Sequence, residues 1–345
     1  MKRGAAMARR KLMQAGLAAS AIMPARTFAG APDRVKLSLE FVADGATAPD
    51  FLAIDRHIYA DLGLDVTPDA SSGSAASIAR VAAGTHEFGL ADASTLIQFA
   101  CRNPDSAPMI VMPIYDVFPG VILSLSRKPL ASLQDLPRFR LGTGTADAGA
   151  QLLPALLKLN HIDPASIQRV TLDVKLRDAM LLKGDVDAVV AFDYTAVFNL
   201  IGNGVKLEDI HLLYYSRSGF DFFGNALLVN REVAARDPDL VRRMALAVAR
   251  GWVAASGSRA AAIDAVVARN QLLDTPTELA RLNWVYDKLI LTANVRQNGL
   301  GAVSTDRIAR AIGFIREGLN FSSAPTVEAL YDPRFMPPAG DRAIA

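Results

Sequence analysis

Small and acidic polar residues recur in this sequence directly after short apolar segments, at the points where strands would end. They are Asp44, Ser72, Gly73, Ser74, Asp92, Ser94 and Thr95 in the first half, and Thr143, Thr145, Asp147, Asp193 and Tyr194 in the second. In an open α/β sheet, a small ligand binds outside the carboxyl ends of the strands, where N–H groups at helix N-termini point outward. The pattern therefore predicts two polar edges that together hold one small molecule. The alternative for each single residue is structural, since Ser74, Ser94 and Thr145 could be helix N-caps and Asp92 or Asp193 could cap a helix or close a turn.

Aromatic residues are concentrated in the same predicted loops. They are Phe41, Tyr115, Phe118, Phe192, Tyr194, Phe220, Phe222 and Phe223. Two rings, one from each half, could enclose a flat heterocycle whose N–H groups donate to a carboxylate. We therefore add Tyr115, Asp116, Phe118, Phe223 and Asn225 to the predicted ligand contacts, while Phe41, Phe192 and Phe222 could instead pack in the core.

The charges in these loops bear on the class of ligand. Four acids are assigned to the cleft, Asp44, Asp92, Asp116 and Asp193, whereas Arg and Lys are sparse there and Arg217 is the nearest candidate. A sulfonate or nitrate site is expected to offer a guanidinium group or several N–H donors without nearby carboxylates. The sequence thus favours a neutral or amine-bearing planar ligand.

Motifs for catalysis or metal binding are missing from the sequence. The four histidines are dispersed without a partner at ligand spacing, and no Gly-x-Ser-x-Gly, P-loop or His-Glu-x-x-His motif occurs. Cys101 is the only cysteine, which excludes an intramolecular disulfide and a cysteine metal cluster. We expect no catalytic residues, no metal and no cofactor.

The elements that must position the polar residues form a βαβ unit over residues 63–95. A strand at 64–68, a loop of small residues at 70–74 and a helix at 75–83 precede a strand at 87–91 that ends at Asp92. The second half echoes this order, with a small-residue loop at 144–147 and a strand at 186–192 that delivers Asp193 and Tyr194. The chain after residue 230 is predicted to be helical, with Asp237-Pro238 opening one helix and Thr275-Pro276-Thr277-Glu278 acting as a capping box for another.

The stretch 63–95, GLDVTPDASSGSAASIARVAAGTHEFGLADAST, resembles the extracytoplasmic solute-binding proteins of ABC importers. Within them it is most similar to the nitrate, sulfonate, taurine and thiamine-pyrimidine-precursor group, the NMT1/THI5-like group. FVADGATAPDFLAIDRHIY at 41–59 matches that group's first strand, ligand loop and helix, and the resemblance extends over about 35–335.

This resemblance implies an α/β fold of the periplasmic binding protein type II class, with a ligand cleft between two lobes joined by two crossover strands. We place lobe 1 at residues 33–120 plus 228–345 and lobe 2 at 121–227, with crossovers near 119–121 and 226–230. The implied partners are a small-molecule ligand and an ABC importer permease in the inner membrane, and a monomer is the expected state.

The first 29 residues are typical of an export signal, with a basic start, an apolar stretch at 12–23 and Thr27-Phe28-Ala29 before the cut. Arg9-Arg10 is compatible with twin-arginine export as well as with an ordinary secretory signal. Six Lys and Arg residues lie in this segment, which leaves 31 basic against 35 acidic residues in the remainder. That balance argues against a nucleic-acid partner, and we expect a soluble periplasmic protein.

The sequence therefore predicts a solute-binding protein for a planar, amine-bearing heterocycle such as a pyrimidine. The alternatives are an alkanesulfonate, taurine or nitrate-binding protein of the same group, and an enzyme of pyrimidine synthesis on the same fold. A sensory domain would need a DNA-binding or transmembrane output segment, which the sequence does not contain.

Overall fold

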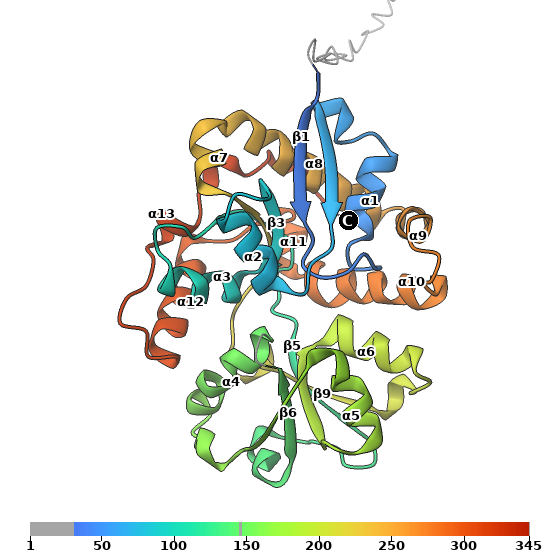
Figure 1. Cartoon of the computed structure of the whole chain (residues 1–345), viewed down its shortest axis with the longest axis vertical. Coiled ribbons are helices and arrows are strands. Elements are labelled where there is room, and N and C mark those ends of the chain that lie inside the picture. The colour runs from blue at the N-terminus through green and yellow to red at the C-terminus, as the bar shows by residue number, and fades with distance from the viewer. Residues whose placement is uncertain (1–30, 145–146, 345) are drawn as a thin grey trace, which may run out of the picture.

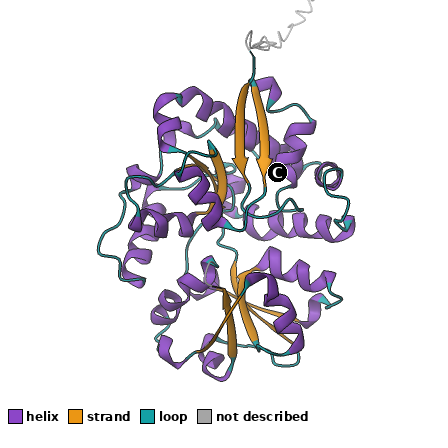
Figure 2. Cartoon of the chain, in the orientation of Figure 1, coloured by secondary structure: helices purple, strands orange, loops and turns teal. Residues whose placement is uncertain are grey.

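The computed structural model describes residues 31–144 and 147–344, which form two α/β lobes, one above the other (Figures 1 and 2). The predicted export signal lies outside these residues. Lobe 1 contains a five-stranded sheet of order β2-β1-β3-β10-β4, made of β1 (Asp33–Ser38), β2 (Leu64–Asp69), β3 (Phe88–Asp92), β4 (Met109–Pro113) and β10 (Asn225–Val229). Lobe 2 contains a sheet of order β7-β6-β8-β5-β9, made of β5 (Gly120–Leu125), β6 (Arg140–Gly144), β7 (Gln168–Leu172), β8 (Ala188–Phe192) and β9 (Ile210–Tyr214).

The two sheets share one topology. In each sheet the first three strands are parallel, and the fourth, β10 or β5, runs antiparallel to both of its neighbours. The chain crosses between lobes twice, from β4 to β5 and from β9 to β10. The predicted α/β class and two-lobed architecture are confirmed, but the return crossover is displaced: residues 226–229 belong to β10, and the chain crosses before them.

Helices cover both sheets. Lobe 1 carries α1 (Ala48–Asp55), α2 (Ser74–Ala82), α3 (Ala93–Arg102), α7 (Arg231–Arg236), α8 (Pro238–Ser256), α9 (Arg259–Val267), α10 (Thr275–Trp284), α11 (Ala293–Asn298), α12 (Thr305–Gly318) and α13 (Val327–Leu330). Lobe 2 carries α4 (Ala148–Leu159), α5 (Arg177–Lys183) and α6 (Asp193–Gly202). No helix within the described ranges is both long enough and apolar enough to span a membrane.

Local signals account for most helix boundaries. Asp237 caps α8 by accepting from Leu240 N at 2.9 Å, with Pro238 at the first helical position, as predicted. The predicted capping box of α10 is wrong. Asp274 is the N-cap, accepting from Thr277 N at 3.0 Å, and Glu278 turns inward to other partners. The sequence alone did not decide between Asp274 and Thr275 as the N-cap, because both are N-cap residue types at the start of the helix.

The helix α12 bridges the two lobes on the side where the crossovers run (Figure 1). It packs against α3 of lobe 1 and against α4 of lobe 2. A Cβ atom built on Gly318 of α12 would lie 2.4 Å from Cβ of Ala155 in α4, so the two helices approach as closely as glycine allows. One apolar core cluster runs through this contact and contains side chains from both lobes.

Candidate ligand-binding cleft

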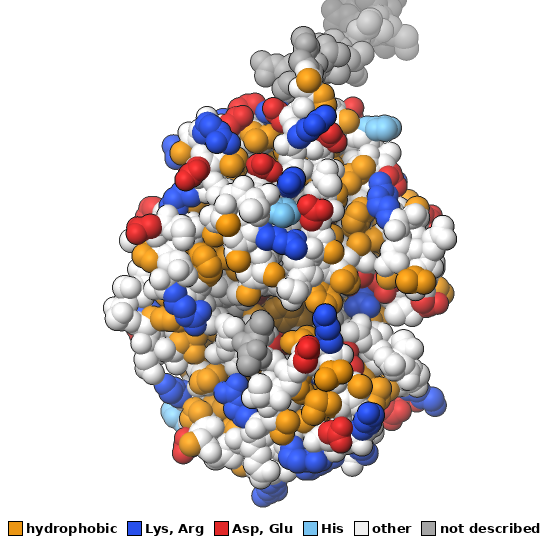
Figure 3. Space-filling view, viewed as in Figure 1, with side chains coloured by type: hydrophobic (Ala, Val, Ile, Leu, Met, Phe, Trp, Pro, Cys, Tyr) orange, Lys and Arg blue, Asp and Glu red, His pale blue; other side chains and the backbone are white. Residues whose placement is uncertain are grey.

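The lobes face each other across a cleft that contains a cavity of about 100 Å³. Lobe 1 lines it with Ser72, Gly73 and Ser74, at the N-terminus of α2, and lobe 2 with Asp147 and Arg177 among other residues. A second, smaller cavity of about 20 Å³ is lined on the lobe 1 side by Asp44, Tyr115, Asn225 and Trp252. Figure 3 shows the molecule hollowed between its two lobes, with hydrophobic side chains within the hollow.

Glu40 is the acidic residue that lines both cavities. Its Oε1 accepts from Ser74 Oγ at 3.0 Å, and its Oε2 accepts from Tyr194 Oη at 2.6 Å and from Asn225 Nδ2. Burial raises the pKa of Glu40 to about 7, against the lowering effect of these hydrogen bonds. Residues from three separate elements, α2, α6 and β10, therefore meet on this carboxyl group, and Tyr194 reaches it from lobe 2.

Sequence reasoning missed Glu40 although a signal was present. Glu40 follows the apolar residues of β1 as Asp92 follows those of β3, so the same rule of polar residues at strand ends applied to it. We instead predicted Asp44, which is also buried. Asp44 accepts from Ala46 N at 2.9 Å, and burial raises its pKa against the opposing charge of Arg281.

Among the described residues that line the two cavities, one is basic, Arg177, and it is not the predicted Arg217. Arg177, the first residue of α5, is only 4% exposed and lines the larger cavity. Its Nε donates to Asp178 at 2.9 Å, and its Nη1 lies 4.0 Å from Asp147. Among the residues that the structure describes, no acceptor is hydrogen-bonded to its Nη atoms. Arg217, the predicted cation, is exposed and lies over the ring of Tyr214 instead.

A second buried arginine belongs to a network beside the smaller cavity. Arg281 donates from Nε to Glu278 at 2.9 Å and from Nη1 to the carbonyl oxygen of Tyr194 at 2.8 Å, and its Nη1 lies 3.8 Å from Asp44. Glu278 also accepts from Gly45 N at 2.6 Å. Because the helix phase that turns these side chains inward is set by packing, the linear sequence carried no signal for this network.

An aromatic wall closes the smaller cavity. The ring of Tyr115 meets the rings of Tyr194 and Trp252 edge-on, with centroids 5.7 and 5.9 Å apart. Asn225 Oδ1 is buried here without a hydrogen-bond partner within residues 31–144 and 147–344. Trp252 lies in α8, far along the chain, and sequence reasoning did not single it out.

Eight of the predicted contacts line one of the two cavities: Asp44, Ser72, Gly73, Ser74, Tyr115, Asp147, Tyr194 and Asn225. Eight others line neither: Asp92, Ser94, Thr95, Asp116, Phe118, Thr143, Asp193 and Phe223. Thr145 lies outside the described residues. Contact of any of these residues with a ligand stays a prediction.

The acids away from the cavities are engaged by the protein itself. Asp92 caps α3 by accepting from Thr95 N at 3.0 Å and from Ser94 Oγ, and burial raises its pKa to about 6. Asp193 accepts from Trp284 Nε1 at 2.8 Å, and burial raises its pKa to about 6 as well. The structural alternative considered for Asp92, a helix cap, is what the geometry shows.

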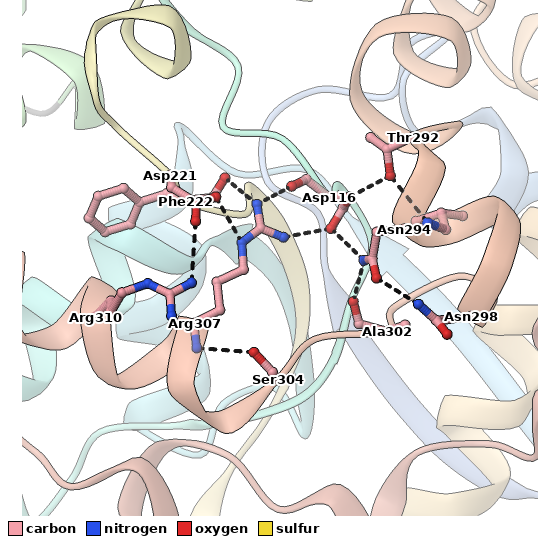
Figure 4. Close-up of polar contacts among 11 residues, drawn as sticks. Asp116, Asp221, Phe222, Thr292, Asn294, Asn298, Ala302, Ser304, Arg307 and Arg310 are labelled. Atoms are coloured by element: carbon pink, nitrogen blue, oxygen red, sulfur yellow. Dashed lines mark hydrogen bonds and ion pairs between the residues drawn. The ribbon is translucent and has the colours of Figure 1, made fainter.

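Asp116 lies in the first crossover and belongs to a polar cluster under α12 (Figure 4). Arg307 donates from Nη1 to Asp116 Oδ1 at 2.6 Å and from Nη2 to the Asp116 carbonyl at 2.7 Å and the Phe222 carbonyl at 3.2 Å. Thr292 and Asn294 donate to the same carboxylate. Arg307 thus ties both crossover segments together.

The predicted aromatic residues separate into two groups. Phe41, Phe192 and Tyr194 line the larger cavity, and Tyr115 lines the smaller one. The rings of Phe118, Phe220, Phe222 and Phe223 are buried in the core cluster that crosses the lobes. Of the three rings that we considered as alternative core residues, only Phe222 is fully in the core.

Comparison with known proteins relates this chain to binding proteins. The sequence profile of the NMT1/THI5-like family matches residues 45–262. The riboflavin-binding protein RibY of Chloroflexus aurantiacus is 24% identical over 221 residues, which are 63% of this chain and 61% of RibY, so the chain spans about three fifths of this curated relative.

Two solved structures share the fold over most of this chain. The periplasmic aliphatic sulphonate binding protein SsuA of Escherichia coli is 13% identical with a TM-score of 0.66, covering 88% of this chain and 99% of SsuA. The alkanesulfonate-binding protein SsuA of Xanthomonas axonopodis pv. citri, bound to MOPS, is 16% identical with a TM-score of 0.65, covering 88% of this chain and 100% of that protein. At such identities the likeness establishes the fold.

Proposed function

Since this chain belongs to the NMT1/THI5-like family, we propose that it is an extracytoplasmic solute-binding protein that delivers a small, planar, amine-bearing organic molecule to an ABC importer. The ligand binds between the lobes, and closure of the lobes presents a surface that a membrane permease recognises. Export to the periplasm follows the predicted signal, by the twin-arginine or the ordinary secretory route. We propose a binding protein rather than an enzyme, acting as a monomer.

The observation that carries this proposal is the set of acceptors and rings at the cleft. Glu40 and the amide oxygen of Asn225 are hydrogen-bond acceptors at cavity walls, and Tyr115, Tyr194 and Trp252 supply flat apolar surface beside them. A planar heterocycle with N–H groups satisfies both features, because its edge donates and its faces stack. RibY is named for binding riboflavin, itself a flat nitrogen heterocycle.

A second candidate is an anionic ligand such as an alkanesulfonate, taurine or nitrate. Arg177 favours it, because a buried guanidinium group that lines the larger cavity is suited to bind an oxyanion in bidentate fashion. The N-terminus of α2, at Ser74, lies on the opposite wall and adds outward N–H groups. Asp147, 4.0 Å from Arg177, opposes this candidate by offering the guanidinium group an internal partner.

Two variants that each remove one charge from the cleft distinguish the candidates. The protein from Gly30 onward is screened by thermal shift and calorimetry against aminopyrimidines, riboflavin, taurine, alkanesulfonates and nitrate. A ligand at a hundredfold excess over its Kd stabilises by about 2.7 kcal/mol, which raises the melting temperature measurably. We expect binding of a heterocyclic amine that is weakened in Glu40→Gln and retained in Arg177→Gln, with exposed Arg310→Gln as the matched control.

The other outcomes are equally informative. Binding of sulfonates or nitrate that is lost in Arg177→Gln overturns the heterocycle and supports the anionic ligand, with the transport role intact. If no compound in these classes binds, the solute-binding function itself is contradicted.

A further inference from the structure

Helix α10 is anchored in lobe 1 but faces lobe 2. It packs on α9 and continues into a π-helix, Val285–Ile290, in which the hydroxyl of Tyr286 donates to the carbonyl of Trp252 in α8 at 2.6 Å. Figure 1 shows α10 along the lower rim of lobe 1, directly above α6 of lobe 2. The contacts between these two helices are therefore contacts between lobes.

Two side chains of α10 hold the first turns of α6. Trp284 donates from Nε1 to Asp193 Oδ2 at 2.8 Å, and its ring meets that of Phe198 edge-on, with centroids 5.8 Å apart. Arg281 donates to the carbonyl of Tyr194 at 2.8 Å, and its guanidinium carbon lies 5.6 Å from the centre of the Phe198 ring. Asp193 and Arg281 are 0% and 5% exposed, so this contact is largely dry.

The contact between α10 and α6 lies where it can affect the movement of the lobes. Figure 1 shows α10 and α6 on one side of the molecule and α12 with α4 on the other. On the α12 side the lobes share a core cluster, Gly318 touches Ala155, and Arg307 ties the two crossovers. Opening of the cleft therefore pivots near α12 and must separate α10 from α6.

The α10 side chains also lie outside the ligand cavities. Neither Arg281 nor Trp284 lines the larger or the smaller cavity, and neither do their partners Asp193 and Phe198. The other partner of Arg281 in α6 is the backbone carbonyl of Tyr194, a residue that lines both cavities, so the bond from Trp284 to Asp193 is the part of this contact that is separate from them. The free energy of the Trp284–Asp193 bond therefore acts on the equilibrium between open and closed lobes and not on ligand contacts.

We propose that α10 is a latch, in which Trp284 and Arg281 grip the N-terminal turns of α6, stabilise the closed arrangement of the lobes and so determine ligand affinity from outside the binding cavities. The apparent Kd of a protein that binds in its closed form rises as the closed fraction falls. The effect on affinity rests on the proposed solute-binding function, whereas the effect on the shape of the free protein does not.

The test measures the distance between lobes without any ligand. Spin labels at Leu207→Cys in lobe 2 and Leu272→Cys beside α10, both exposed sites, report the distance by pulsed electron resonance, and native Cys101 is buried. We expect Trp284→Phe, which removes the donor and keeps an aromatic ring, to raise the ratio of open to closed molecules about tenfold or more. That factor corresponds to losing a hydrogen bond to a charged group.

A second variant and a matched control keep the result decisive. Asp193→Asn places an amide N–H opposite Trp284 Nε1 and breaks the same bond from lobe 2, because Tyr194 N holds the other oxygen. Tyr331→Phe likewise removes a donor and keeps an aromatic ring, at a residue of lobe 1 that lies outside both cavities and outside the α10–α6 contact, and it should leave the distance distribution unchanged.

The outcomes separate the latch from the ligand. Longer distances in both latch variants, with the control unchanged and all proteins folded by circular dichroism, support the latch even if no ligand is found. Distances identical to wild type in both folded latch variants overturn it, even if ligand binding is demonstrated. Where a ligand is known, its Kd should rise in Trp284→Phe by the factor by which the closed fraction falls.

Discussion

The Glu40→Gln substitution tests whether a carboxyl group in the cleft titrates near neutral pH. Burial raises the pKa of Glu40 from an ordinary 4.5 to about 7. A folded state that binds a proton more tightly than the unfolded chain is favoured at low pH. This stabilisation is fully present below pH 4.5 and is lost as the pH rises through 7.

The magnitude follows from the size of the pKa shift. One unit corresponds to about 1.4 kcal/mol, so the titration of Glu40 lowers the free energy of unfolding by roughly 2 to 3 kcal/mol between pH 5 and pH 8. In a chain of this length that amounts to roughly 4 °C in melting temperature. Asp50, Asp92 and Asp193 have pKa values raised by burial to about 7, 6 and 6, so the wild-type protein loses more than this in total.

Urea unfolding of wild type and Glu40→Gln at pH 5 and pH 8 measures the effect. The glutamine keeps the acceptor for Tyr194 and Asn225, and its amide group can donate to Ser74 Oγ, so the cluster persists without the titration. From pH 5 to pH 8, the free energy of unfolding should fall by about 2 to 3 kcal/mol less in the variant than in wild type, because the variant lacks the titration of Glu40.

The matched control is Glu328→Gln, the same change at an exposed position of α13, which should retain the wild-type fall. If Glu40→Gln retains the full wild-type fall, Glu40 does not titrate in this interval, and the assignment of a neutral, protonated Glu40 below neutral pH is refuted.

Two further predictions concern contacts between distant segments of the chain, and the stability change in each is measured from urea unfolding midpoints. Gly45→Ala places a Cβ 2.3 Å from a backbone carbonyl of α10 and should destabilise the folded protein by about 1 to 3 kcal/mol. Its control, Gly313→Ala in α12, meets nothing within 4 Å and should stabilise the folded protein by about 0.5 to 1 kcal/mol. Equal effects of the two substitutions would show that the loop around Gly45 gives way freely. Arg307→Met leaves buried Asp116 without its charge partner and should lower the free energy of unfolding by about 3 to 5 kcal/mol. Its control, Arg310→Met, changes a side chain that is 62% exposed and should lower it by less than about 1 kcal/mol. A small loss in Arg307→Met would contradict the role of Arg307 in holding the two crossovers together.

The fold was predictable because its signals are local. Apolar strand segments, glycine stops such as Gly84 and Gly184 in left-handed conformation, and Asp-Pro helix starts such as Asp237-Pro238 act within a few residues of themselves. The order of these signals, with the resemblance they carry, led to two α/β lobes and a cleft. The loop of Ser72, Gly73 and Ser74 was placed at the cleft for the same reason, since the end of the preceding strand determines where the loop lies.

The candidate site was predictable only in part. Strand-end reasoning led to Asp147 and Tyr194, which line a cavity, and to Asp92 and Asp193, which do not, since Asp92 caps a helix and Asp193 binds Trp284. Contact of these four residues with a ligand stays a prediction. An aspartate after a strand looks the same in sequence whether it faces a ligand or a helix N-terminus. Its direction depends on the neighbour that the fold supplies.

By itself, then, the sequence indicated the α/β class and the polar edges of the cleft, because each rests on signals between residues close in the chain, while the two-lobed architecture was implied by the family resemblance. The tertiary structure decided that Glu40 lines both cavities, that Arg177 lines the larger one, and that α10 contacts α6. Glu40 meets Tyr194 154 positions away, and Trp284 meets Asp193 91 positions away. Such pairs arise only when long-range packing sets the rotation of each helix and the approach of the two lobes, and no local pattern encodes that rotation.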